Sequence, residues 1–346
     1  MSEARRMIRV PKKYLFSVLC FSLLWGWNAM ARSPHDWLEL MVDANGKYNY
    51  QGTLVHMCDG TMDIVHIVHR VDRGLVTERM TAQALGGRQI IRNADEVMCI
   101  LPDQKKVMVE RRESAASPIG SRIANFPSFS NISASLYGVA MLGSDRVADR
   151  ETVMLEIRPV DTHRYGYRLW LDRLTALPLK FELVDDDGQA LEQGVFTEIK
   201  FRESISAKDV EPTITTDEFE WQRSSVVSDG AEDNGNSLSS GSSADEPVRS
   251  GWWVATMPPG FELTFAQSQL AEGATAPMEQ LVYSDGLATI SVFIESEVEA
   301  SAAVEGMSRM GATNAFTTFR DGYLITAMGG VPLDTARMVA LSVTPR

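Results

Sequence analysis

Cysteine and histidine are scarce in this chain, and acidic residues outnumber basic ones. The 346 residues include 3 cysteines, 5 histidines, and 33 lysines and arginines against 46 aspartates and glutamates, which gives a net charge of −13. Such a surface repels phosphate backbones and anionic membranes, so we expect no nucleic-acid partner. Hydrophobic residues still make up 44% of the chain, which suits a folded protein of about two domains.

The familiar sequence motifs of enzymes are missing as well. The chain has no G-x-S-x-G motif and no glycine-rich phosphate loop after a strand pattern. His66 and His69 have a spacing that suggests a metal site, but on a strand a separation of three residues puts the two rings on opposite faces. We therefore expect no enzyme activity, no metal site and no cofactor, and an exported hydrolase is the least favoured alternative.

No apolar run reaches the roughly 20 residues that a membrane-spanning helix needs. Instead, a basic stretch ending at Lys13 precedes an apolar run over residues 14–27, and Ala29-Met30-Ala31 has the form of a cleavage site. This pattern predicts a signal peptide over residues 1–31, cleaved after Ala31, and export to the periplasm. Cleavage leaves 28 basic and 45 acidic side chains, a net charge of −17.

Only Cys58 and Cys99 remain in the exported chain. An exported protein permits a disulfide between them, and closing such a long loop would stabilise the fold by about 3–4 kcal/mol. Two separate thiols, buried or partly buried, are the other interpretation. Because pairing geometry cannot be deduced from the sequence, both stay open.

What the chain does contain is alternation of apolar and polar residues. Ser33-Pro34 starts a short amphipathic helix that ends near Asn45-Gly46. From Tyr48 the period changes to two, and turn signals recur about every ten residues. The clearest strand patterns cover residues 50–57, 63–71, 88–92, 106–110 and 152–160. Short strands joined by tight turns predict an antiparallel meander or barrel.

The stretch RYGYRLWLDRLTALPLKFEL, residues 164–183, predicts a hairpin of two strands joined by DRLTA, residues 172–176. Arginines and tyrosines of its first strand alternate, so they face opposite sides of one sheet and cannot form a single catalytic cluster. The apolar side is either core or, in a barrel that does not close fully, the lining of a cavity for an acyl chain or an extended peptide. The residues proposed to line the cavity or its supporting core are Tyr165, Tyr167, Leu169, Leu171, Leu179 and Phe181.

Two stretches interrupt the strand patterns. Residues 112–135 are rich in Ser, Pro and Asn with scattered apolar side chains, which indicates a loop or short helices lying over the sheet. Residues 222–250 are dense in Ser, Gly and Asp and predict a flexible linker. The linker divides a large domain, residues 32–221, from a small α+β domain, residues 251–346. Hairpins around Asp285 and Asp321 and a helix opened by Pro332 make up most of the small domain.

The order of motifs resembles the MucB/RseB family, and the likeness runs through nearly the whole chain after the signal peptide. The segments that carry it are YQGTLVHM, MDIVHIVHR, IIRNADEVMCILPD, RVADR, RYGYRLWLDRLTALPLKFEL, LEQGVFTEIKF, MPPGFEL, YSDGLATISVFIE, GATNAF and GGVPLDTARMVALSV. The resemblance implies a fold of the α+β class with mostly antiparallel strands, in which a large unclosed β-barrel like those of LolA and LolB precedes the small C-terminal domain.

The same resemblance implies a periplasmic negative regulator of the envelope-stress sigma factor, sigma-E or AlgU. Such a protein binds the periplasmic domain of an inner-membrane anti-sigma factor, RseA or MucA, and protects it from regulated proteolysis. Lipopolysaccharide or lipoprotein acyl chains entering the cavity release the partner, and oligomer exchange accompanies this release in the family, so a homo-oligomer is one expectation. The alternative function is a periplasmic lipid or lipoprotein carrier, which would transfer acyl chains and would not need residues 251–346.

Overall fold

The structure is a computed structural model that describes residues 32–84, 86–111, 132–223, 250–269, 277–296 and 305–346. Residues Pro34–Arg346 form one compact unit. The predicted signal peptide, most of the predicted 112–135 connection and residues 224–249 of the predicted linker lie outside the described residues. The division into two domains therefore stays a prediction.

The first helix and strands follow the predicted alternation. Helix α2, Pro34–Asn45, begins at the predicted proline, and its buried side chains are Trp37, Leu38, Met41 and Ala44. The strands up to residue 111 are β1 Asn49–Cys58, β2 Thr61–Asp72, β3 Leu75–Ala82, β4 Gln89–Arg92, β5 Glu96–Leu101 and β6 Lys106–Arg111, with the short 3-10 helix η1 Pro102–Gln104 before β6. Turns with positive φ at Asp59, Gly60, Arg73 and Gly74 reverse the chain between the first three strands.

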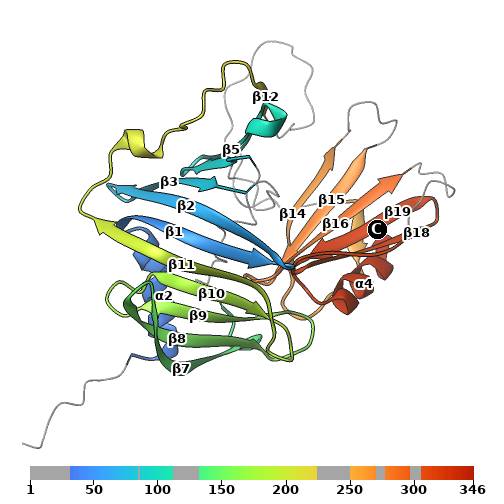
Figure 1. Cartoon of the computed structure of the whole chain (residues 1–346). Helices are drawn as coiled ribbons and strands as arrows, with labels where there is room; N and C mark the ends of the chain where they lie inside the picture. Colours follow the sequence, from blue (N-terminus) through green and yellow to red (C-terminus); the bar gives the residue numbers. More distant parts are fainter. Residues whose placement is uncertain (1–31, 85, 112–131, 224–249, 270–276, 297–304) are drawn as a thin grey trace, which may run out of the picture. The chain divides into compact units, whose positions relative to one another are not determined.

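Further strands extend the same sheet after residue 132. They are β7 Tyr137–Val147, β8 Arg150–Pro159, β9 Gly166–Asp172, β10 Pro178–Val184, β11 Ala190–Arg202 and β12 Glu220–Arg223, with the 3-10 helix η2 Ala207–Val210 before β12. The resulting 12-stranded sheet has the order β12-β6-β5-β4-β3-β2-β1-β11-β10-β9-β8-β7 (Figure 1). Within the described residues its outer strands, β12 and β7, do not pair with each other, so the sheet is unclosed. The predicted fold class is thus confirmed.

One strand pair in this sheet is parallel, and the alternation did not predict it. Strand β12 runs parallel to β6, with Trp221 opposite Val107, whereas every other pair of the sheet is antiparallel. Residues 222 and 223, which the composition assigns to the linker, therefore belong to a strand.

Residues 250–346 form the remaining sheets and one helix. Their elements are β13 Trp252–Val254, β14 Glu262–Gln269, β15 Met278–Ser284, β16 Thr289–Ser296, β17 Gly306–Met310, β18 Thr313–Arg320, β19 Tyr323–Gly329, α4 Leu333–Leu341 and β20 Val343–Pro345. Strands β14–β19 make a six-stranded antiparallel sheet, and β13 pairs with β20. The predicted turns at Asp285 and Asp321 join β15 to β16 and β18 to β19.

Helix α4 begins directly after the predicted Pro332. Its buried side chains are Thr335, Ala336, Val339 and Ala340. Small side chains let the helix pack closely on its own sheet, whose buried residues include Ile290, Val292 and Ile325.

Candidate functional site

An apolar face of the large sheet lies under helix α2. Trp37, Leu38 and Met41 of α2 pack in one cluster with Leu155, Ile157, Leu169 and Leu171 of β8 and β9. We call these four strand residues the α2-covered face. Because the side chains at α2 positions 37, 38 and 41 point to one side of a helix, the sequence pattern of α2 brings them to this face together.

The predicted cavity residues are divided between two clusters. Leu169 and Leu171 belong to the α2-covered face, and Tyr167 and Phe181 pack against it partly buried. Leu179 instead packs with Trp170 in the other main cluster of the large sheet. Leu169, Leu171 and Leu179 are all 0% exposed, so in this structure they are core. Whether this group also lines a cavity stays a prediction.

A bulge explains why Leu179 leaves the group. Pro178 is opposite Leu171 and Lys180 is opposite Trp170, so Leu179 is an extra residue in β10. One extra residue moves the side chains on one side of it to the other face of the sheet. The assumption of unbroken alternation through residues 177–185 was therefore wrong, although the predicted hairpin itself is confirmed.

Tyr165 lies just before β9, apart from both clusters. Its hydroxyl accepts a hydrogen bond of 3.0 Å from Asn314 Nδ2 of β18, and the same amide also donates to the carbonyl of Val331. Tyr165 therefore contacts residues of the six-stranded sheet rather than the α2-covered face.

A histidine–glutamate pair stands beside the partly buried aromatic residues. His56 Nε2 of β1 lies 2.7 Å from Glu192 Oε1 of β11, and the ring of His56 is 6.5 Å from that of Phe181. Gly194, opposite both His56 and Phe181, leaves the space that the Phe181 ring fills, since a Cβ there would lie 2.2 Å from the ring. The sequence analysis missed this pair, whose signal is a polar residue between Leu54 and Cys58 on an alternating strand.

The phenolic hydroxyl of Tyr167, at the edge of this face, stays protonated. Burial, followed by the negative charges of Glu192 and Asp285, raises the pKa of Tyr167 well above its ordinary value. Tyr167 is thus a neutral side chain, with most of its ring against apolar neighbours.

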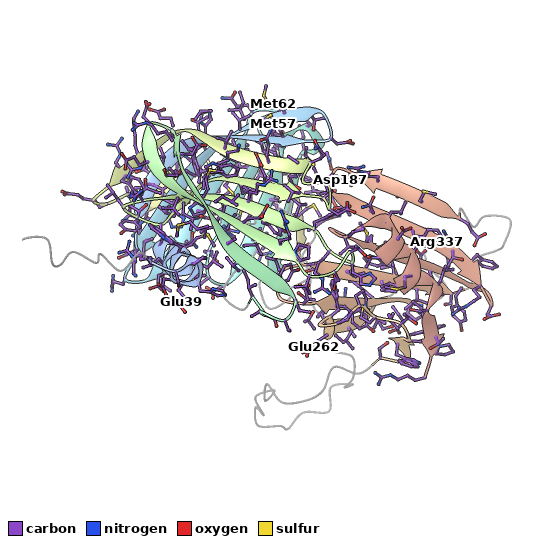
Figure 2. All side chains as sticks on the ribbon, turned by 90° about the horizontal axis from the view of Figure 1, so that it is seen from below. Glu39, Met57, Met62, Asp187, Glu262 and Arg337 are labelled. Atoms are coloured by element: carbon purple, nitrogen blue, oxygen red, sulfur yellow. The ribbon has the colours of Figure 1, made fainter. Side chains whose placement is uncertain are left out.

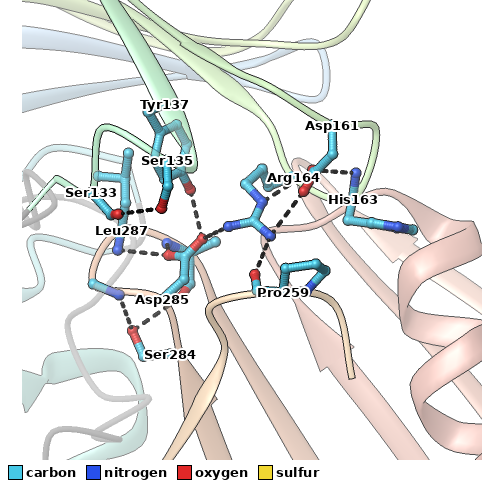
Figure 3. A network of polar contacts seen from close by, with 12 residues as sticks. Ser133, Ser135, Tyr137, Asp161, His163, Arg164, Pro259, Ser284, Asp285 and Leu287 are labelled. Atoms are coloured by element: carbon cyan, nitrogen blue, oxygen red, sulfur yellow. Dashed lines mark hydrogen bonds and ion pairs between the residues drawn. The ribbon is translucent and has the colours of Figure 1, made fainter. Parts of the chain in front are cut away.

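Arg164 is the centre of a buried polar network that joins the β8–β9 connection to the β15–β16 turn (Figure 3). Its guanidinium donates through Nε to Asp161 at 3.1 Å, through Nη1 to Asp285 at 2.5 Å, and through Nη2 to the carbonyl of Pro259 at 2.7 Å. The hydroxyl of Tyr137 donates to the same Asp285 oxygen at 2.8 Å. We call these five residues the Arg164 junction.

The central ion pair of the Arg164 junction is fully buried. The side chains of Arg164 and Asp285 are both 0% exposed. Burial, together with Asp285, raises the pKa of Tyr137, which keeps its hydroxyl a donor. The guanidinium also lies 5.0 Å from the centre of the Phe261 ring. A buried pair with this many hydrogen bonds is satisfied, and removing one partner would leave an uncompensated charge.

Further contacts surround the Arg164 junction. Thr335 Oγ1 of α4 donates to the carbonyl of His163 at 3.1 Å. Leu287 of the β15–β16 turn belongs to the same apolar cluster as the α2-covered face. A Cβ on Gly260 would lie 2.3 Å from Leu136, so the backbone there sits directly on that side chain. Residues 250–346 therefore contribute directly to the surroundings of the α2-covered face.

The cysteines are not joined in a disulfide. Cys99 on β5 is a buried free thiol, and Cys58 is at the end of β1, with β2, β3 and β4 between the two strands. Of the two interpretations of the pair, the structure has separate thiols. Met57 and Met62 are opposite each other near the tip of the β1–β2 hairpin, next to Cys58 (Figure 2).

The histidines of β2 face opposite ways, as the strand pattern predicts. His66 is exposed and has hydrogen bonds to Thr53 and Gln83, whereas His69 is buried beside Glu78. Across the described ranges, no group of three or more His, Cys, Asp or Glu side chains could hold a metal ion. In the same ranges, no helix is both long and apolar enough to cross a membrane.

The side chains around the α2-covered face hold elements of the fold together. The α2-covered face, the partly buried aromatic residues beside it and the Arg164 junction consist of side chains that pack or pair with one another. Their polar atoms are used in hydrogen bonds that hold elements together, and the phenolic groups keep their protons.

Two family models match the chain over most of its length. The MucB/RseB N-terminal domain matches residues 33–214, and the MucB/RseB C-terminal domain matches residues 246–344. The sigma factor AlgU regulatory protein MucB of Pseudomonas aeruginosa is 32% identical over 326 residues, which cover 91% of this chain and 92% of the relative. The sigma-E factor regulatory protein RseB of Haemophilus influenzae is 26% identical, over 97% of this chain and 99% of the relative.

Solved structures agree with these relatives. The complex of Pseudomonas aeruginosa MucA and MucB superposes with a TM-score of 0.67 at 28% identity, and covers 90% of this chain and 99% of that one. MucB in complex with MucA(peri) gives a TM-score of 0.66 at 29% identity, over 91% of this chain and 99% of that one. Sequence and fold therefore lead to one conclusion: the chain belongs to the MucB/RseB family.

Proposed function

We propose that this protein is a periplasmic negative regulator of the envelope-stress sigma factor and acts by binding the periplasmic domain of a membrane anti-sigma factor. The observation that carries the proposal is the match over 90% of the chain to MucB solved with MucA. The likeness includes both matched family domains, which supports a role like that of these relatives.

The location follows from the same proposal. A protein that binds a periplasmic domain must be exported, and residues 1–31 have the basic, apolar and small-residue pattern of a signal peptide. Residues 32–221 and 251–346 act as two domains in this proposal.

While bound, the protein shields the anti-sigma segment from the regulated protease. Acyl chains of lipopolysaccharide or lipoprotein are the releasing signal, and the α2-covered face is where they bind. Each methylene removed from water contributes about 0.8 kcal/mol, and couplings between sites are typically about 1–3 kcal/mol. A few methylenes are therefore enough to favour release, provided that α2 gives way, because α2 occupies this face in the structure.

The function is binding and not catalysis in this proposal. The relatives are named as regulatory proteins. Arginines and tyrosines of residues 164–168 are engaged in structural contacts: Arg164 in the junction, Tyr165 with Asn314, and Arg168 with Glu156.

A protection assay tests the proposal. The exported chain, residues 32–346, is mixed with the periplasmic domain of the anti-sigma factor from the same organism, and cleavage by the cognate regulated protease is followed with and without lipopolysaccharide. We expect the half-life of the anti-sigma domain to rise severalfold with the protein and to return on addition of lipopolysaccharide. A column that carries the protein and retains none of the anti-sigma domain would contradict the proposal.

The carrier alternative gives a different result in a second assay. Vesicles with a fluorescent acyl donor are mixed with acceptor vesicles, and transfer is measured with the full exported chain and with residues 32–221 alone. Rapid transfer by both, without protection of the anti-sigma domain, would favour the carrier.

A further inference from the structure

His69 is a buried side chain whose two ring nitrogens both meet hydrogen-bond acceptors. It lies on β2 and is 0% exposed. Its Nδ1 is 2.5 Å from Glu78 Oε1 of β3, and its Nε2 is 2.8 Å from the backbone carbonyl of Asn45, the last residue of α2. The histidine therefore connects the end of the helix to the sheet on which the helix lies.

The acceptors determine how many protons the ring carries. A backbone carbonyl only accepts, so Nε2 must be protonated. Glu78 Oε1 accepts as well, because Arg92 donates through Nε and Nη2 to the other carboxylate oxygen and holds Glu78 ionised. Burial opposes this ionisation, but Arg92 and His69 outweigh it and lower the pKa of Glu78 to about 2. Nδ1 must therefore be protonated too.

We propose that His69 is a buried imidazolium that fastens the carboxyl end of α2 to the large sheet, so that loss of one proton releases that end. A neutral ring keeps a proton on one nitrogen only. The other nitrogen then presents a lone pair either to the Asn45 carbonyl or to the Glu78 carboxylate, and that contact becomes repulsive.

Groups from four elements surround His69, and two of them place negative charge next to the ring. Glu78 supplies the negative charge from β3, and the carbonyl end of α2, which has no basic residue in its last turn, supplies a partial negative charge. Tyr50 of β1 stacks on the ring at 4.6 Å between centroids and 9° between planes. The second cation, Arg92 of β4, is on the far carboxylate oxygen of Glu78.

Other titratable groups near the end of α2 do not take part in its contact with the large sheet. Asp43 and Lys47 flank Asn45, are more than half exposed and pair with each other at 3.0 Å. Burial raises the pKa of the Tyr50 hydroxyl far above its ordinary range, so this hydroxyl stays protonated at neutral pH. The proton on His69 is then the one that changes the contacts of α2.

Release of the helix end has a defined consequence for the α2-covered face. Trp37, Leu38 and Met41 cover that face from the same helix, so a looser α2 exposes Leu169 and Leu171. A rise in pH therefore uncovers apolar surface. Only the use of this surface by acyl chains depends on the proposed function; the protonation of His69 and its effect on α2 do not.

Magnetic resonance on the exported chain with ¹⁵N-labelled histidine tests the protonation directly. We expect the ring of His69 to show two N–H groups at about pH 6, where an unperturbed histidine is already partly neutral. The exposed His66 of the same strand is the internal reference. A single N–H on His69 at this pH would overturn the proposal, and the measurement needs no variant that has to fold.

Hydrogen exchange of the α2 amides tests the consequence. Protection factors, corrected for intrinsic exchange, are compared from about pH 5 to about pH 8 in the unchanged protein, in His69→Gln and in the matched control His66→Gln. We expect protection in α2 to fall at least about tenfold as the pH rises, to be low throughout in His69→Gln, and to follow the unchanged protein in His66→Gln. Protection that does not depend on pH in the unchanged protein would contradict the release.

Discussion

Asp285 uses its two carboxylate oxygens for two separate tasks. Oδ1 accepts from the backbone N–H groups of Leu287 and Ala288 at 2.8 and 2.7 Å, which closes the turn between β15 and β16. Oδ2 accepts from Arg164 and Tyr137. The Ser-Asp-Gly pattern predicted the turn, but nothing local to it predicted a partner that is 121 residues away in the sequence.

Asp285→Asn separates the two tasks. The asparagine oxygen can still accept at the turn, but its amide places a donor where Arg164 and Tyr137 also donate. We expect a loss of about 3 kcal/mol in the free energy of unfolding, because Asp161 still partly compensates the buried guanidinium. Urea denaturation of both proteins measures this loss.

Arg158→Met is the control for this change. Arg158 pairs with Glu156 while 73% exposed, so its removal should cost less than about 1 kcal/mol. Equal losses in the two variants would show that burial of the Arg164–Asp285 pair has no special effect on stability.

Glu78 makes the free energy of unfolding depend on pH in the acidic range. Its pKa in the folded protein is about 2, below the ordinary 4.5, so ionised Glu78 stabilises the fold. This contribution is complete above about pH 4.5 and is lost as the pH falls through about 2. We expect the free energy of unfolding to decline over this window, and to decline less steeply in Glu78→Gln, as followed by denaturant unfolding at each pH.

Glu198→Gln serves as the comparison for Glu78. Glu198 is an exposed carboxylate whose pKa is lowered by a hydrogen bond from Lys200. Water screens such a surface pair, and its replacement should leave the acid dependence nearly unchanged. If Glu78→Gln and Glu198→Gln reduce the pH dependence of the free energy of unfolding equally, the buried cluster around Glu78 is not the cause of that dependence.

At the scale of elements, alternation and turn residues predicted most strands, and irregularities account for the failures. The bulge at Leu179 moves that residue out of the group that Leu169 and Phe181 form. A bulge needs only one extra residue, and the local sequence, which stays apolar at alternate positions through Phe181, does not show it. The parallel pairing of β12 with β6 was missed because β12 has only four residues, the last two of which the composition assigned to the linker.

Substitution of Gly329, at the end of β19, tests how closely the strands of the six-stranded sheet approach one another. A Cβ there would lie 2.2 Å from the carbonyl oxygen of Thr289, a backbone atom of the neighbouring strand, whereas at Gly330 nothing lies within 4 Å. We expect Gly329→Ala to destabilise the protein by about 1–3 kcal/mol through forced strand separation. Thermal unfolding with Gly330→Ala as the adjacent control checks this, and similar melting temperatures for both would contradict it.

At the scale of the whole molecule, the sequence predicted the fold class and the family because both depend on the order of many segments. The buried contacts that connect distant segments were not predictable in this way. Arg164 with Asp285, and His69 with the end of α2, depend on which strands become neighbours, and a single sequence does not contain that information until the sheet order is known. The cavity residues illustrate the same limit, since alternation assigned Leu179 to a group that it does not join.

The last four residues complete the fold of residues 250–346. Val343 is 0% exposed, and β20 pairs with β13 across Trp252 to Val254. Removing residues 343–346 should cost at least about 2 kcal/mol, because Val343 leaves the core and β13 loses its partner. Removing Arg346 alone, which donates one backbone hydrogen bond to Gly251, should cost far less. Circular dichroism during urea unfolding distinguishes the two, and indistinguishable curves would contradict the importance of β20.

The pairing of β13 with β20 places the start and the finish of residues 250–346 next to each other, with Trp252 opposite Pro345. A segment with adjoining ends can be transplanted as a single insertion into a surface loop of an unrelated host, or sealed head to tail into a circle, without stretching its backbone. Residues 250–346 could in this respect be joined to another chain at two neighbouring points, once the contact of Asp285 with Arg164 is replaced.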